Sequence, residues 1–215
     1  MFGVLLFAAS ACAFSEPEAY AIGPWTLGMS RDDVVAFEQF GPYTPVRVTG
    51  GIETAHGEFE GRPANISFGF DDAGLSYIQV WKYEGKDYAA AKAAALDVFA
   101  LFGDRFDGAA MRDIDRKDGK KLDAGSVAAV LETVFGTAQK LGKKFAAENK
   151  VWATFILDMD PIKQPRNGKL HAQFSYSARY DTFYVFVFQD RPSAPSRAAK
   201  GNVRLDKMDP SGTPQ

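Results

Sequence analysis

The chain has 215 residues, of which 46% are hydrophobic and 18 are phenylalanine, so it contains enough apolar material for one good-sized folded domain. Its formal net charge of −2 argues against a general nucleic-acid binder. A single cysteine excludes an intrachain disulfide and metal sites built on several cysteines, so the fold depends on packing.

The N-terminal stretch has the pattern of a secretory signal. Residues 2–14 carry no charged side chain, and this apolar run passes into small residues, as in a signal peptide with its cleavage zone. Cleavage fits after Ala13 or after Ala21, so residues 1–21 are interpreted as a signal peptide whose cleavage site stays open. Because the run is too short to span a bilayer, the sequence predicts an exported protein, periplasmic or associated with the outer membrane.

Cys12 leaves a second interpretation open. Ala9-Ser10-Ala11-Cys12 is similar to a bacterial lipobox, whose cysteine becomes the lipidated first residue, although Ala9 stands where Leu is usual. The mature protein is then either soluble or held by a lipid anchor on Cys12. In both forms the sequence predicts no transmembrane span.

A helix followed by three strands is expected after the signal. Ser30 and Asp33 stand in the relation of a helix N-cap pair, and apolar residues follow at helical spacing up to residue 41. Three strand-like runs separated by turn residues come next: residues 52–60, 64–70 and 75–83. We expect them to form an antiparallel meander.

The register of this meander is estimated by pairing Phe70 with Leu75 across the second turn. The pairs that follow from it form the expected core face: Phe68 with Tyr77, Ile66 with Gln79, and Ala64 with Trp81. The opposite face then carries mostly polar and small side chains, with two apolar ones: Thr54, His56, Glu58, Asn65, Ser67, Gly69, Ser76, Ile78 and Val80.

The middle of the chain is predicted to be helical with one loop. Residues 88–102 are rich in Ala and large apolar side chains, which favours a helix that covers the meander. Residues 103–122 are charged and contain glycine, which is typical of a loop. Residues 123–147 carry an apolar stripe at helical spacing, which predicts a long helix. Glycines within this segment leave open whether the helix is continuous or broken.

A second set of strands is expected at residues 151–159, 170–179 and 183–188. The last run is apolar on both faces, so we place it at the centre of its sheet. His171 lies on the polar face of its strand, where we expect it at the surface. Residues 191–215 are rich in Pro, Ser, Ala and Lys, which is typical of a disordered tail.

These elements predict an α+β fold of two three-stranded antiparallel meanders packed with helices. Residues 22–190 are expected to form a single domain of two helix-plus-meander halves.

The candidate binding site is the polar face of the first meander, with His56, Glu58, Asn65 and Ser67. No G-x-S-x-G or H-E-x-x-H motif is present, and no loop has the spacing of a phosphate or calcium site. We therefore expect no catalytic residue, no metal ion and no cofactor. If this polar face does not bind a partner, the aromatic face of the last strand is the alternative, with Tyr184, Phe186 and Phe188.

Five segments carry a family resemblance: residues 28–34 (GMSRDDV), 53–54 (ET), 59–62 (FEGR), 65–68 (NISF) and 74–85 (GLSYIQVWKYEG). They look like segments of uncharacterised exported proteins of proteobacteria, which implies export but no activity. More distantly, G-M-S-x-x-x-V before a meander with F-x-F-D-x-x-G-L resembles the helix-then-meander modules of small outer-membrane assembly lipoproteins (BamE-like) and of the β-lactamase inhibitory protein. Those modules bind other proteins, so the resemblance implies a protein-binding role.

The leading interpretation is a non-enzymatic module that presents a sheet face to another envelope protein. One alternative is a small-ligand carrier with an apolar pocket between sheet and helix. Another is a hydrolase-type enzyme that uses His56 with Glu58 and neighbouring polar groups.

Overall fold

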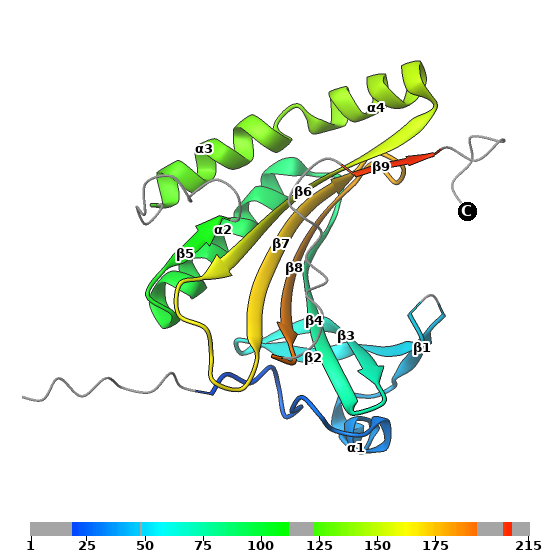
Figure 1. Cartoon of the computed structure of the whole chain (residues 1–215), viewed down its shortest axis with the longest axis vertical. Helices are drawn as coiled ribbons and strands as arrows, with labels where there is room; N and C mark the ends of the chain where they lie inside the picture. The colour runs from blue at the N-terminus through cyan, green and yellow to red at the C-terminus, as the bar shows by residue number, and fades with distance from the viewer. Residues whose placement is uncertain (1–18, 48, 112–122, 193–203, 208–215) are drawn as a thin grey trace, which may run out of the picture.

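The computed structural model describes residues 19–47, 49–111, 123–192 and 204–207. Figure 1 shows a curved antiparallel sheet with helices along one side of its second half and a short helix below its first half. The expected α+β class with antiparallel strands is therefore confirmed.

The first half of the chain begins with a capped helix. The Ser30 side chain accepts a hydrogen bond from the backbone N–H of Asp33, whose carboxylate accepts one from the Ser30 N–H. The elements that follow this cap are α1 (Arg31–Val35), a 3₁₀ turn η1 (Glu38–Phe40), β1 (Thr44–Val46), β2 (Gly51–Phe59), β3 (Arg62–Asp71) and β4 (Gly74–Gly85).

The second half supplies the other helices and strands. They are α2 (Tyr88–Arg105), β5 (Ala109–Met111), α3 (Ala124–Phe135), α4 (Ala138–Asn149), β6 (Val151–Pro161), β7 (Lys169–Ser177), β8 (Thr182–Asp190) and β9 (Arg204–Lys207). The expected long helix is broken into α3 and α4 at Gly136. The expected loop instead contains the end of α2 and strand β5, and its remainder, residues 112–122, lies outside the described residues. Strand β9 lies within the segment predicted to be a disordered tail, and residues 193–203 and 208–215 lie outside the described residues.

The two expected meanders, β2 to β4 and β6 to β8, do not stay separate. They join through antiparallel pairing of β4 with β8 into a nine-stranded sheet of order β1-β2-β3-β4-β8-β7-β6-β5, with β9 also on β6. Strand β8 therefore lies inside the sheet between β4 and β7, as its two apolar faces predict.

The register expected for β3 and β4 is wrong beyond the turn. Phe70 pairs with Leu75 as expected, but a bulge follows, and Phe68 lies opposite Ile78. The bulged residue is Ser76, whose hydroxyl donates to the Gly69 carbonyl over 3.0 Å. Because one inserted residue moves every later side chain to the other face, the core face of β4 holds Ile78 and Val80, and not Tyr77, Gln79 and Trp81.

A second bulge, between Thr54 and Gly57 of β2, corrects the expected position of Thr54. Thr54 is buried opposite Ile66 on the core face, where its hydroxyl donates to the Phe40 carbonyl. The hydrogen bond compensates the burial of this hydroxyl.

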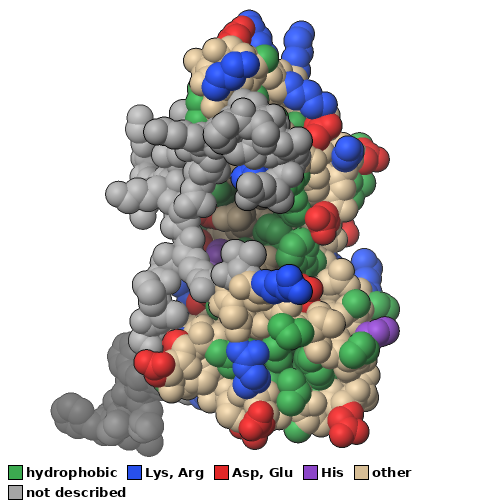
Figure 2. Space-filling view, turned by 90° about the vertical axis from the view of Figure 1, so that its right-hand side faces the viewer, with side chains coloured by type: hydrophobic (Ala, Val, Ile, Leu, Met, Phe, Trp, Pro, Cys, Tyr) green, Lys and Arg blue, Asp and Glu red, His purple; other side chains and the backbone are tan. Residues whose placement is uncertain are grey.

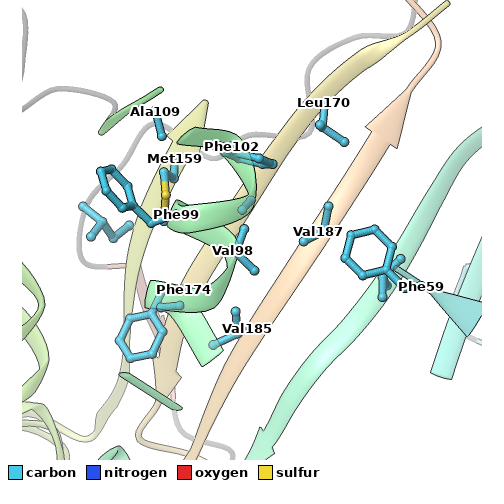
Figure 3. Close-up of a cluster of buried hydrophobic side chains, with 14 of the residues drawn as sticks. Phe59, Val98, Phe99, Phe102, Ala109, Met159, Leu170, Phe174, Val185 and Val187 are labelled. Atoms are coloured by element: carbon cyan, nitrogen blue, oxygen red, sulfur yellow. The ribbon is translucent and has the colours of Figure 1, made fainter. Parts of the chain in front are cut away.

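The core lies between the sheet and the helices. Figure 3 shows Val98 and Phe102 of α2 beside Val185 and Val187 of β8 and Phe174 of β7. Because successive side chains of a strand point to opposite faces, the other residues of these strands face away from the helices. The helices that the structure describes pack on the core side, and we call the opposite side the helix-free face.

Candidate binding face

The helix-free face extends across both meanders. It carries Asn65 and Ser67 of β3, Tyr77, Gln79, Trp81 and Glu84 of β4, Tyr184, Phe186 and Phe188 of β8, His171, Gln173 and Ser175 of β7, and Asp158 of β6. Figure 2 views the molecule from this side and shows hydrophobic side chains gathered in a hollow between its upper and lower parts. The face therefore combines apolar and polar groups.

An aromatic row, formed by Trp81, Tyr184, Phe186 and Phe188, is the main apolar feature of this face. The Trp81 and Phe186 rings meet edge to face, with centroids 4.9 Å apart. Tyr184 and Phe186 are stacked at 5.6 Å, and Phe186 and Phe188 lie 5.8 Å apart. All four side chains are half-buried, so part of each ring stays accessible.

The pairing of β4 with β8 creates this row. Phe183, Val185 and Val187 turn toward the helices and are buried, so the alternate residues of β8 must face the other way. The cross-strand register then places Trp81 directly opposite Phe186. The sequence signal for this site was the run of apolar residues on both faces of β8.

Two of the four predicted binding residues adjoin the aromatic row. Ser67 accepts a hydrogen bond from the indole Nε1 of Trp81 over 3.0 Å. Asn65 is exposed and lies opposite Trp81 in the register of β3 and β4. Polar groups therefore stand next to the apolar row.

The other two predicted residues lie apart from it. His56 is exposed in the bulge of β2, where its backbone N–H donates to the Thr54 hydroxyl over 3.0 Å. Glu58 is exposed opposite Pro63 and lines an open groove with Arg105. Among the described residues, no hydrogen bond joins the His56 imidazole to Glu58. Cys12, the predicted lipidation site, lies outside the described residues.

A polar cluster lies farther along the face, on β6 and β7. Gln173 donates to the Asp158 carboxylate over 3.0 Å, and the His171 Nδ1 lies 3.3 Å from the Asp190 carboxylate. The His171 ring also stacks on Phe188, with centroids 4.7 Å apart. His171 is only 2% exposed, so its expected surface position is wrong. Phe188 and Asp190 of the neighbouring strand β8 lie against the ring.

Two exposed carboxylates lie on the same face as the aromatic row. Glu53 of β2, opposite Ser67, and Glu84 of β4, opposite Tyr184, are both exposed. Burial raises the pKa of the Tyr184 hydroxyl, and the nearby negative charge of Glu84 raises this pKa further. The phenol therefore stays neutral and can donate a hydrogen bond.

The described residues contain no group of three or more side chains suited to hold a metal ion. Within those same ranges, no helix has the length and hydropathy needed to cross a membrane.

Comparison with models of protein families, with curated proteins and with solved structures finds no match to this chain.

Proposed function

We propose that the protein is an exported, non-enzymatic module that binds another envelope protein through the aromatic row of its helix-free face. The observation that carries the proposal is the row itself. Apolar side chains of a sheet normally face its helices, yet Trp81, Tyr184 and Phe186 lie on the side without them. A contiguous, partly accessible apolar patch rimmed by polar groups is typical of a protein-interaction site.

The arrangement of the polar groups also favours binding over hydrolysis. A hydrolase built on His56 requires its imidazole to meet a nucleophile and an orienting carboxylate within hydrogen-bond distance. His56 is instead exposed in a bulge, without a hydrogen bond from its imidazole to Glu58 among the described residues. Asn65, by contrast, is exposed beside the aromatic row and can set its specificity, while the buried Ser67 hydroxyl holds the Trp81 indole.

Capture of partners from the native envelope tests the proposal. We expect the double variant Tyr184→Ser with Phe186→Ser to capture at least tenfold less partner, because central aromatic side chains contribute most of the binding energy at such surfaces. The double variant Val35→Ala with Leu141→Ala is the control, since it removes two exposed apolar side chains that belong to helices α1 and α4. Equal capture by both double variants would contradict the proposal.

A cross-linking experiment keeps the test independent of folding losses in the aromatic variants. A photoreactive group on Asn65→Cys, in a Cys12→Ser background that removes the natural thiol, reports what lies over Trp81. We expect it to join the protein captured by the unmodified chain. The same group on Glu148→Cys, exposed on α4, should not join that protein.

A further inference from the structure

The charge distribution of the helix-free face indicates what kind of partner it accepts. Strands β2, β3, β4 and β8 place the exposed carboxylates Glu53 and Glu84 on this face. Glu84 lies opposite Tyr184 at one end of the aromatic row, and Glu53 lies on β2 at the level of Phe188, the other end, across Ser67 and Gln79. The Lys and Arg side chains of these four strands, Lys82 and Arg62, lie elsewhere. Both line a groove against α2, where the Lys82 ammonium lies 5.3 Å from the Phe59 ring centroid.

Cationic groups near the ends of this region are engaged by other contacts. Arg191 follows β8, and its guanidinium pairs with Asp71 over 3.2 Å and donates to the Leu75 carbonyl. Arg179, beyond the end of β7, lies 5.5 Å from the Tyr180 ring centroid. Lys169 is the one lysine on the helix-free side of β7. It lies at the end of this strand, opposite Asp190 of β8. The region around Trp81 is therefore aromatic and acidic.

We infer that the partner presents a cationic, extended segment, in which Lys or Arg side chains alternate with apolar ones, to the aromatic row between Glu53 and Glu84. This inference rests on the proposed function and adds the chemistry of the partner to it. Tyr184, Phe186 and Phe188 are successive same-face residues of one strand, so the row is about 13 Å long, which matches four or five extended residues. Indole and phenol faces also attract ammonium and guanidinium groups.

Two synthetic peptides serve as probes. One is a ten-residue peptide that alternates Lys with Leu, and the other carries Glu at every Lys position. Titration of each labelled peptide into the full chain, followed by fluorescence anisotropy, gives its affinity. We expect the Lys peptide to bind at least tenfold more tightly than the Glu peptide at low salt, with the difference shrinking as salt screens exposed charges.

A matched pair of charge variants tests whether the carboxylates beside the aromatic row cause the preference for the Lys peptide. Glu53→Lys with Glu84→Lys should weaken the Lys peptide about tenfold and strengthen the Glu peptide. Glu38→Lys with Glu148→Lys changes the net charge equally through exposed carboxylates on η1 and α4, and should have little effect. A selective loss in the first double variant supports the inference.

Three outcomes overturn it: equal binding of the two peptides, equal effects of the two double variants, or no binding of the Lys peptide. If the peptides bind equally and Tyr184→Ser with Phe186→Ser abolishes both, the charge preference fails while the proposed binding face stands. If that aromatic variant leaves both the peptide affinity and the capture from the envelope unchanged, the proposed function itself fails.

Discussion

Ser76 decides on which side of the sheet each later residue of β4 lies. Its insertion directs Ile78 to the core and Trp81 to the helix-free face, where the indole can reach Ser67. The Gly69 position allows this arrangement, because a Cβ there would lie 1.6 Å from the Tyr77 ring. A side chain at Gly69 would therefore force Tyr77 out of its place.

Neighbouring residues of β4 test this register directly. Ile78 is fully buried, so Ile78→Ala should lower the free energy of unfolding by about 2–5 kcal/mol through lost burial and a residual cavity. Gln79→Ala, one residue later on the helix-free face, should cost less than about 1 kcal/mol. Urea melts of both variants check the expectation. A larger loss for Gln79→Ala than for Ile78→Ala would reverse the assignment of faces.

The sequence did not predict this register because both faces of β4 are apolar. Leu75, Tyr77 and Trp81 form one apolar set at alternating positions, and Ile78 and Val80 form another. Either set can therefore be assigned to the core face from the sequence alone. A bulge leaves the composition of a strand unchanged and becomes visible only through its pairing. The strands were therefore predictable, whereas the face that each residue occupies was not.

At the level of elements, the turn between β7 and β8 contacts α4 through polar side chains. Asp181, between β7 and β8, accepts hydrogen bonds from Lys143 of α4 over 2.8 Å and from the Tyr176 hydroxyl over 2.9 Å. The hydrogen bond from Lys143 is the main reason that the pKa of the Asp181 carboxyl lies below its ordinary value, and the Tyr176 hydroxyl lowers this pKa further. Deprotonated Asp181 therefore stabilises the packing of α4.

Asp181→Asn should lower the free energy of unfolding at pH 7 by about 0.5–1 kcal/mol, because the ion pair is partly exposed. Asn accepts the positive φ of 51° at this position, so the backbone conformation is kept. A depressed pKa in the folded state contributes stability above the unfolded value of about 3.9, and this stability is lost as the pH falls through the folded pKa.

Chemical denaturation at several pH values measures this difference. The gap between the unmodified chain and Asp181→Asn should be constant at neutral pH and close below about pH 4. Lys143→Met, which removes the same ion pair from the α4 side, should reproduce the pH dependence. A gap that persists at low pH would show that the carboxylate charge is not responsible.

Considering the whole molecule, Tyr20 connects both halves of the sheet. Its backbone N–H donates to the Asn167 side chain over 2.9 Å, and its carbonyl accepts from Gln189 over 2.8 Å. Its hydroxyl donates to Glu60 of the first meander over 2.7 Å, and its ring meets Phe106 edge to face at 5.4 Å. Tyr20 is 5% exposed, so it belongs to the folded domain.

Under the proposed export, this anchoring predicts where the signal peptide is cleaved. Cleavage after Ala21 would remove Tyr20 and leave Asn167, Gln189 and Glu60 without these hydrogen bonds, whereas cleavage after Ala13 retains them. We expect the mass of the mature native protein to include Tyr20. A chain that begins at Ile22 should unfold at lower urea concentration than one that begins at Phe14. A native N-terminus at Ile22 would contradict the prediction.

The proposed binding face was only partly predictable at this scale. Asn65 and Ser67 were identified from local strand patterns, and the apolar character of β8 was visible in the sequence. The aromatic row, however, depends on β4 pairing with β8, two strands from different meanders. Contacts between segments so far apart leave no periodic signal in either one, so Trp81 could not be assigned to the site from local patterns.

Strand β1, at one edge of the sheet, limits how another chain can pair with this molecule. Strand β1 has only three residues, and one of them, Pro45, has no backbone N–H. Such a short, proline-containing edge strand is a poor template for an incoming strand, so another protein cannot readily extend the sheet there. Main-chain pairing accepts almost any sequence and is disfavoured at this edge. Selection of a partner by this molecule would therefore depend on side-chain contacts instead.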